Sequence, residues 1–290
     1  MKSFAVVLLL AFACPHVLAQ GNRTLPISTQ ALLNGVKSTE SKGAIQSVLK
    51  IVCPKTQKKG TGFVLAGGNV IVTNSHVVET CTAQELVATS AVTTEPVRFT
   101  GGLTDPNRDL AILCASKSLP FRLHLSGDQQ PSVETEVETW GYPLIHEDSA
   151  PLLSRGYVAG YSVNVPQTGA TPVKRLIING AFNPGNSGGP LIDRSTGKVI
   201  GVVVTKWTLW SPQIEEAIYG FAHSQTGSGG TFSYVNTQGQ RVGVTNEQVL
   251  SQVLNEFYKT SQVMIGEAIS ISELNGFLKE KQKDLACNSK

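Results

Sequence analysis

Charged residues are scarce in this chain. They make up 16% of its 290 residues, against about 25% in an average soluble domain. The 24 Lys and Arg residues nearly balance the 21 Asp and Glu residues, and the net charge is +3. A protein that binds nucleic acid by neutralising phosphates needs a larger basic surplus. The composition therefore argues against nucleic acid as a partner, while 41% of apolar residues is enough for a folded core.

Long apolar runs are also missing. The run over residues 4–14 is too short to span a bilayer, and no later stretch approaches about eighteen apolar residues. Lys2 precedes this run, Pro15 ends it, and Val17-Leu18-Ala19 suits a signal-peptidase site. We expect residues 1–19 to be a signal peptide rather than an uncleaved anchor. The mature chain would then be secreted, periplasmic or extracellular, without stable membrane insertion.

Cysteines are few, and their spacing suits no metal. Cys14 would leave with the signal peptide, so four would remain: Cys53, Cys81, Cys114 and Cys287. They form no C-x-x-C pair and have no neighbouring histidine cluster, which argues against a zinc site. We expect no metal and no cofactor. An even number of cysteines in an oxidising compartment favours two disulfides, and four cysteines allow three pairings.

The rest of the sequence is organised as short β-rich runs. From residue 47 to residue 205 they alternate with Gly, Asn, Asp and Pro, without helical patterns between them, which predicts a sandwich or barrel. Residues 20–44 are polar and aperiodic and are expected to be a flexible leader. The Gly and Pro of residues 126–131 divide two β units, 45–126 and 127–290. Helical patterns follow only in the tail, first after Thr245 and then over residues 271–286.

Three segments contain residues suited to catalysis. His76 follows the apolar strand 70–73, Asp109 begins another apolar run, and Ser187 lies within Asn-Pro-Gly-Asn-Ser-Gly-Gly-Pro-Leu. A serine hydroxyl needs a base to remove its proton and donors to hold the developing oxyanion. Glycines beside Ser187 would let the amides of Gly185 and Ser187 point at one spot. Each segment alone is a weak signal, but together, in the order His, Asp, Ser, they indicate a catalytic triad.

These motifs resemble those of the trypsin-like serine peptidases, and most of all the bacterial high-temperature-requirement branch. The matching segments are residues 60–65, 73–78, 109–113 and 183–191, within a weaker likeness from about residue 47 to 205. The resemblance implies an all-β, chymotrypsin-like fold of two six-stranded antiparallel β-barrels, with the site in the cleft between them. His76 and Asp109 would come from the first barrel and Ser187 from the second. The tail is too short and too helical for the PDZ domain of that branch.

The last barrel strand has two candidates. Residues 218–224 and 263–270 both contain the Gly and Ala of the family's final strand. We favour 263–270 because a capped helix follows it directly, which makes residues 207–262 an insertion.

The resemblance also implies specificity residues. Aligned on Ser187, Ala181, Phe182 and Val203 fall at the primary specificity pocket, and Val204, Thr205 and Lys206 would pair with the substrate backbone. None of the pocket positions is charged, so small or medium apolar side chains should be preferred before the scissile bond. Glu267 would favour basic residues if it reached the pocket. Asn186 replaces the Asp that pairs with a freed N-terminus in zymogens, so we expect activity without internal cleavage.

Disulfide pairing follows from the same resemblance. The first strand would bring Cys53 near Cys81, behind the base, and a C-terminal helix packed on the first barrel would bring Cys287 to Cys114. Free buried thiols are the alternative.

The function that these observations predict is a secreted serine endopeptidase acting on protein or peptide substrates, with the oligomeric state open. The alternative is a catalytically silent trypsin-like binding protein. A hydrolase of esters or lipids is disfavoured, because those enzymes use Gly-x-Ser-x-Gly and the order Ser, Asp, His.

Overall fold

The computed structural model describes residues 29–65, 67–93, 95–144, 150–165, 170–206, 231–235, 241–246, 248–251, 253–254, 265–282, 284 and 287. The expected signal peptide lies outside these ranges, as do most of residues 207–262 and most of the tail helix predicted after Thr245. In the described part of the chain, no helix combines the length and the apolar character needed to cross a membrane.

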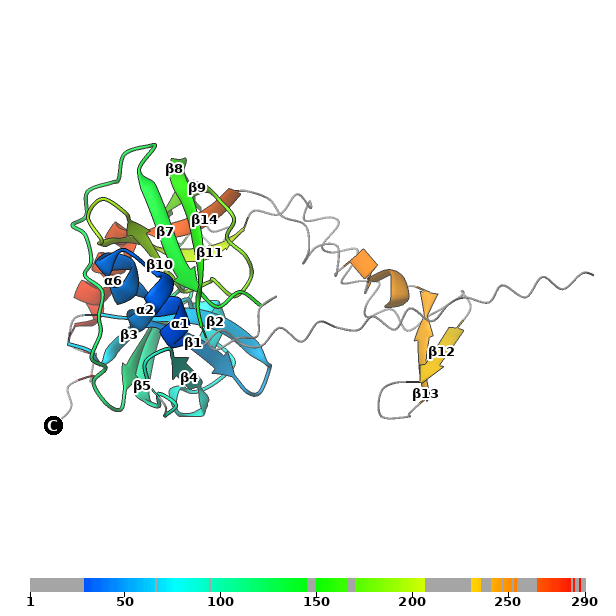
Figure 1. The fold of residues 1–290 in the computed structure, drawn as a ribbon. Coiled ribbons are helices and arrows are strands. Elements are labelled where there is room, and N and C mark those ends of the chain that lie inside the picture. The colour runs from blue at the N-terminus through cyan, green and yellow to red at the C-terminus, as the bar shows by residue number, and fades with distance from the viewer. Residues whose placement is uncertain are drawn as a thin grey trace, which may run out of the picture.

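Two groups of antiparallel strands make up the body, one drawn above the other in Figure 1. The first is a six-stranded sheet in the order β4-β1-β2-β3-β6-β5. Its strands are β1 (Val48–Cys53), β2 (Lys58–Val64), β3 (Val70–Thr73), β4 (Val87–Ser90), β5 (Phe99–Asp105) and β6 (Leu110–Ala115). The helix α3 (Ser75–Val78) and the 3₁₀ turn η1 (Ala83–Glu85) lie between β3 and β4.

The first sheet is a half-barrel, whereas the sequence predicts a closed barrel. Strands β4 and β5 stand at its two edges, and they approach only through an isolated bridge between Ala88 and Val97. The strand β4 has four residues, and β5 begins only at Phe99, so their overlap is too short for a continuous ladder. The all-β, chymotrypsin-like class is otherwise as predicted.

The second group closes into a barrel in the order β10-β11-β14-β9-β8-β7. Its strands are β7 (Glu136–Gly141), β8 (Leu152–Asn164), β9 (Val173–Gly180), β10 (Pro190–Asp193), β11 (Val199–Lys206) and β14 (Ile265–Ser270). Because β14 pairs with both β11 and β9, residues 265–270 form the last barrel strand, as the sequence favours. In the sequence between β11 and β14, β12 (Thr231–Val235) and β13 (Arg241–Thr245) pair with each other as a separate two-stranded sheet.

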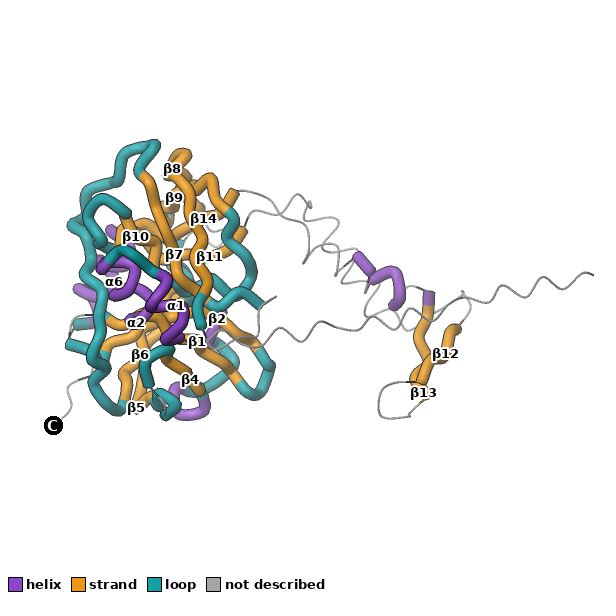
Figure 2. The backbone as a smooth tube through the Cα atoms, viewed as in Figure 1, coloured by secondary structure: helices purple, strands orange, loops and turns teal. Residues whose placement is uncertain are grey.

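Part of the expected flexible leader is helical. The structure has α1 (Thr29–Gly35) and α2 (Thr39–Ser47), and both lie over the place where the two groups of strands meet (Figure 2). The helix α2 begins at a Ser38 cap, whose side chain accepts from the Ser41 amide at 3.1 Å. Ser41 also donates to the buried carboxylate of Glu138 at 2.7 Å, which fastens α2 to the second barrel. Neither the cap nor this contact follows from the polar composition of the segment.

One apolar core joins the two halves. It includes side chains of α2, of the first sheet, of the second barrel and of α6 (Ile271–Lys281). In α6, Ile271, Leu274 and Phe277 are buried at helical spacing, while Glu273 lies in the first turn and Lys279 and Lys281 in the last. The helix was predicted to run to residue 286 and ends instead at Lys281.

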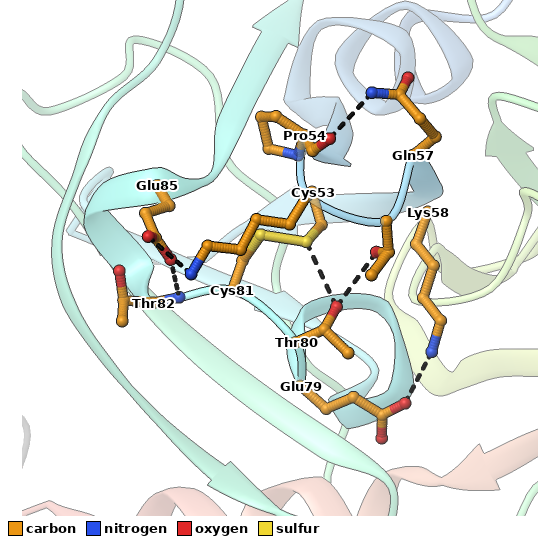
Figure 3. The surroundings of a disulfide bond; sticks show 11 residues. Cys53, Pro54, Gln57, Lys58, Glu79, Thr80, Cys81, Thr82 and Glu85 are labelled. Carbon is orange, nitrogen blue, oxygen red and sulfur yellow. Dashed lines mark hydrogen bonds and ion pairs between the residues drawn. A yellow bond between two sulfur atoms is a disulfide. The ribbon is translucent and has the colours of Figure 1, made fainter.

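Two disulfides link distant parts of the chain. Cys53, at the end of β1, is joined to Cys81 with 5.8 Å between the Cα atoms. Figure 3 shows this bond beside Thr80, whose hydroxyl lies 3.3 Å from the Cys53 sulfur. Cys114, near the end of β6, is joined to Cys287 beyond α6, with 4.9 Å between the Cα atoms. The first bond fixes the turn that follows α3, and the second fastens the tail to β6.

We expect non-reducing peptide mapping to recover Cys53 linked to Cys81 and Cys114 linked to Cys287. In the chain-entropy model, loops of 28 and 173 residues correspond to about 3.5 and about 5 kcal/mol. The double variant Cys114→Ala/Cys287→Ala should therefore lose more unfolding free energy than Cys53→Ala/Cys81→Ala. A recovered Cys53–Cys114 peptide would contradict the pairing.

Candidate active site

His76 and Asp109 are brought together by adjacent elements of the first sheet. His76 lies in α3 directly after β3, and Asp109 directly precedes β6, which pairs with β3. The His76 Nδ1 atom is 2.9 Å from Asp109 Oδ2, and the His76 amide donates to Oδ1 at 3.0 Å. Since a carboxylate only accepts, the proton sits on Nδ1, and Nε2 keeps the free lone pair of a base.

The backbone at Asp109 is held in an unusual conformation. Its φ is +57°, in the left-handed region that side-chain-bearing residues rarely adopt. The Asn74 side chain, fully buried, donates to the Asp109 carbonyl at 2.9 Å. Asn74 thus fixes the main chain while the His76 amide fixes the carboxylate. Asn74 belongs to the Thr-Asn-Ser-His motif, but the motif alone gives no reason to assign it this contact.

The loop that carries Ser187 depends on two glycines. Gly185 has φ +100° and Gly188 has φ +84°. A Cβ atom on Gly185 would collide with the backbone of Tyr142 and Leu144, and one on Gly188 with Thr61 and Thr73. The motif glycines are therefore required both by conformation and by close packing.

The directions of the Gly185 and Ser187 amides are set by hydrogen bonds to the carbonyl groups of the same peptide units, those of Pro184 and Asn186. The carbonyl of Pro184 accepts from the Leu144 amide at 2.8 Å, and the carbonyl of Asn186 accepts from the Gly189 amide at 2.9 Å. In a planar trans peptide, the N–H points opposite to the carbonyl. Within the described residues, neither the Gly185 N–H nor the Ser187 N–H donates to a protein acceptor. Both donors are thus oriented and available before any ligand binds.

The role of Thr61 was not indicated by the sequence. It is fully buried in β2. Its amide donates to the Ser187 carbonyl at 2.8 Å, and its hydroxyl donates to the Gly185 carbonyl at 2.7 Å. The same hydroxyl accepts from the Tyr142 amide at 3.0 Å. Thr61 therefore holds the serine loop and the end of β7 against the first sheet.

Asn186 is a buried, uncharged residue. It is 1% exposed, and its Cα would lie 3.3 Å from a Cβ placed on Gly141, in the Trp-Gly-Tyr-Pro segment. Asn186 Oδ1 has no hydrogen-bond partner among the described residues. A carboxylate at this position would be desolvated without a cation, which agrees with a loop that needs no N-terminal ammonium to form.

The Ser187 hydroxyl is hydrogen-bonded to β11 in this structure. It donates to the carbonyl of Val204 in β11, and no hydrogen bond to His76 is present in the described part of the chain. Side-chain hydrogen bonds of catalytic groups are often incomplete without substrate. A rotation about the Cα–Cβ bond would release the hydroxyl from Val204.

The predicted pocket residues are mostly core residues. Phe182 is 1% exposed and Val203 fully buried, both in the interior of the second barrel, while Ala181 is half-buried. A Cβ on Gly266 would lie 3.1 Å from the Phe182 Cβ, so the Phe182 side chain packs directly on Gly266. The ring fills space that a deep pocket would need.

Glu267 lies on the other face of its strand. Its neighbour Ala268 pairs with Val203 inside the barrel, whereas Glu267 accepts from Ser162 at 3.5 Å on the outer face. Since successive residues of a strand alternate between faces, the carboxylate points away from the barrel interior that holds Phe182.

One edge of β11 has no strand partner beside Ser187. Strand β10 accompanies β11 only as far as Val202, whereas β14 continues alongside it to Lys206. Among the described strands, none pairs with the opposite edge of residues 204–206. This is the edge on which an extended peptide would add as a strand.

A charged cluster anchors the loop that precedes Asp109. Arg108 binds Asp105 at 2.7 Å, Glu273 at 3.3 Å and Glu280 at 2.7 Å. Its hydrogen bonds lower the pKa of the Glu280 carboxyl. Because Glu273 and Glu280 belong to α6, the loop at the start of β6 is fixed to the C-terminal helix.

Residues 60–202 match the family model for the trypsin-like peptidase domain. The chain belongs to the trypsin-like serine peptidases. The resemblance inferred from the motifs is thereby confirmed, and the match covers the segments that carry His76, Asp109 and Ser187.

Curated relatives agree with this family. The chain is 30% identical over 150 residues to the "Probable periplasmic serine endoprotease DegP-like" of Pseudomonas putida, covering 51% of this chain and 29% of that protein. It is 30% identical over 169 residues to the magnetosome formation protease MamE of Paramagnetospirillum magneticum, covering 56% and 22%. The chain thus spans less than a third of the length of these relatives.

The fold is also similar to that of a solved protease structure. The inactive form of Rv3671c from M. tuberculosis aligns with a TM-score of 0.56 at 20% identity, covering 90% of this chain and 97% of that one. At this identity the likeness concerns the fold alone.

Replacing the Thr61 hydroxyl should loosen the serine loop. Thr61→Val keeps the shape but leaves the Gly185 carbonyl and the Tyr142 amide without their partner, which should cost about 2–5 kcal/mol of unfolding free energy. Thr61→Ser keeps the hydroxyl and should cost about 1 kcal/mol. Denaturant unfolding measures both, and equal losses would show that the hydroxyl does not hold the loop.

Proposed function

We propose that this chain is an exported serine endopeptidase that hydrolyses peptide bonds through Ser187, His76 and Asp109. The observation that carries the proposal is the pair of oriented, unused amides at Gly185 and Ser187 next to a His–Asp pair. A catalytic serine requires both an activated base and donors for the oxyanion. The names of the relatives, a serine endoprotease and a protease, support the same reaction class.

In the proposed reaction, the Ser187 hydroxyl leaves Val204 and attacks the substrate carbonyl while His76 Nε2 takes its proton. The oxyanion binds to the amides of Gly185 and Ser187. His76 then protonates the leaving amine, and water repeats the sequence to release the acid. Asp109 stabilises the imidazolium that forms, and no cofactor takes part.

Two observations support export. Residues 1–19 have the pattern of a signal peptide, and one relative is named a periplasmic protein. The mature chain would act in a periplasmic or extracellular space, where the two disulfides persist. Its partners would be protein or peptide substrates that bind as an added strand along Val204–Lys206.

A catalytically silent binding protein is the second candidate, because the Ser187 hydroxyl is bound to Val204 rather than to His76. The two candidates differ in one property. Only an enzyme activates the serine toward electrophiles.

We expect a fluorophosphonate probe to label the purified protein at Ser187. The variant Ser187→Ala should fold as the parent does, remain unlabelled and lose peptide hydrolysis by several orders of magnitude. Intact-mass spectrometry measures the labelling, and circular dichroism checks the fold. A parent protein that resists the probe would favour the silent binding protein.

We expect small apolar residues, such as Ala or Val, before the scissile bond, because Phe182 fills the space against Gly266. Selectivity should stay loose, since one methylene changes rates only about 10–200-fold in an apolar pocket. The variant Phe182→Leu should shift the preference toward larger residues, with Val133→Ala, a change at an exposed position, as the matched control. A peptide-library profile with strong Arg preference would contradict the assignment.

A further inference from the structure

Arg175 is a buried cation with no ion-pair partner among the described residues. It lies in β9, is 6% exposed, and its Nε and Nη1 atoms are fully buried with no hydrogen-bond partner among the described residues. No ion pair within the described residues includes it. Burying an isolated charge is costly, so such a group calls for a physical explanation.

The segments that carry Arg175 and Asp109 are linked by one carboxylate, that of Glu273. Glu273 of α6 accepts from Arg108 through Oε2 at 3.3 Å and from the Lys174 amide through Oε1 at 3.1 Å. Asp109 is the residue after Arg108, and Arg175 is the residue after Lys174. A further hydrogen bond, from Asn107 to the Thr171 carbonyl at 3.0 Å, runs between the same two segments. The loop before β6 and the start of β9 therefore lie side by side.

The strand register places Arg175 and Glu267 on one face. Glu267 pairs with Ile177, and Arg175 lies two residues from Ile177 on the same strand. Residues two apart on a strand share a face, and diagonal neighbours on that face lie within reach of long side chains. Ser162, which pairs with Arg175, also donates to Glu267. Arg175 is thus flanked by Glu267 on one side and by the Asp109 segment on the other.

The charges around this position are mainly negative. Burial lowers the pKa of Arg175, and the charges of Glu267, Asp109 and Glu273 oppose that effect. Glu273 is already bound by Arg108, which also binds Asp105 and Glu280. Glu79, three residues after His76, is paired with Lys58. Among the described residues, Glu267 has no cationic side chain bound to it. Asp109 has only His76.

We propose that Arg175 is a positioning residue for the triad, whose buried charge offsets that of Glu267 beside the segment that carries Asp109. The inference rests on the proposed function. Without Arg175, no buried cation would offset the charges of Glu267 and Asp109, so the net negative charge acting on His76 would increase. Arg175 acts through Asp109 and does not need to touch the substrate.

The test is the pH dependence of fluorophosphonate labelling from pH 5 to pH 9, measured as a second-order rate constant on the full chain. The small, uncharged probe avoids any effect of substrate side chains. Removing a positive charge stabilises the imidazolium form of His76, so Arg175→Met should move the acidic limb to higher pH, on the order of half a pH unit. Glu267→Gln should move it to lower pH, and Arg175→Met/Glu267→Gln should return it near the parent position.

Two controls separate charge from structure. Arg175→Lys keeps the charge and should leave the limb in place, and so should Lys174→Met, which removes an exposed charge from the neighbouring position. If Arg175→Met does not fold, Glu267→Gln alone still decides through the direction of its shift. An unmoved limb in Glu267→Gln, or shifts of the same sign in both single variants, would overturn the role of Arg175. Labelling that persists in Ser187→Ala would instead overturn the proposed triad.

Discussion

A single buried hydroxyl group joins the two halves of this protein at the point where its chemistry is proposed to occur. The Thr61 side chain binds the Gly185 carbonyl and accepts from the Tyr142 amide, while the Thr61 main chain binds the Ser187 carbonyl. Each of these groups is buried, so each bond that is lost leaves an unsatisfied polar atom. The position of Ser187 relative to His76 is therefore set by the first sheet, although Ser187 belongs to the second barrel.

Hydrogen bonds to neighbouring peptide groups also orient the two amides that are proposed to hold the oxyanion. A peptide group is rigid, so a hydrogen bond to its carbonyl also fixes the direction of its N–H. Pro184 and Asn186 supply those carbonyls, and their partners, Leu144 and Gly189, come from the end of β7 and from the serine loop itself. The directions of these two amides are therefore set by main-chain hydrogen bonds, which side-chain identity influences only indirectly. This explains why the loop requires glycines and yet tolerates an uncharged Asn186.

The sequence predicted what depends on local motifs and missed what depends on long-range contacts. The segments around His76, Asp109 and Ser187 and the all-β fold could be read from residue types and spacing, and the last strand from the family resemblance. The roles of Thr61 and Asn74 could not, because their partners lie in other segments and a hydroxyl or an amide has many possible uses. The helix α2 was missed for a similar reason, since its contact with Glu138 spans 97 residues. The open edge between β4 and β5 depends on strand lengths that composition does not determine.

The strand that begins after Asp109 is fastened at both ends by parts of the chain that are synthesised much later. Arg108 is bound to α6 at its start, and Cys114 is joined to Cys287 near its end. The second barrel likewise closes only when β14 is available to pair with β9 and β11. A growing polypeptide therefore leaves the ribosome without an assembled nucleophile site, and the final covalent link forms only where thiols are oxidised. With export as proposed, the complete fold would form only after the chain has reached an oxidising compartment.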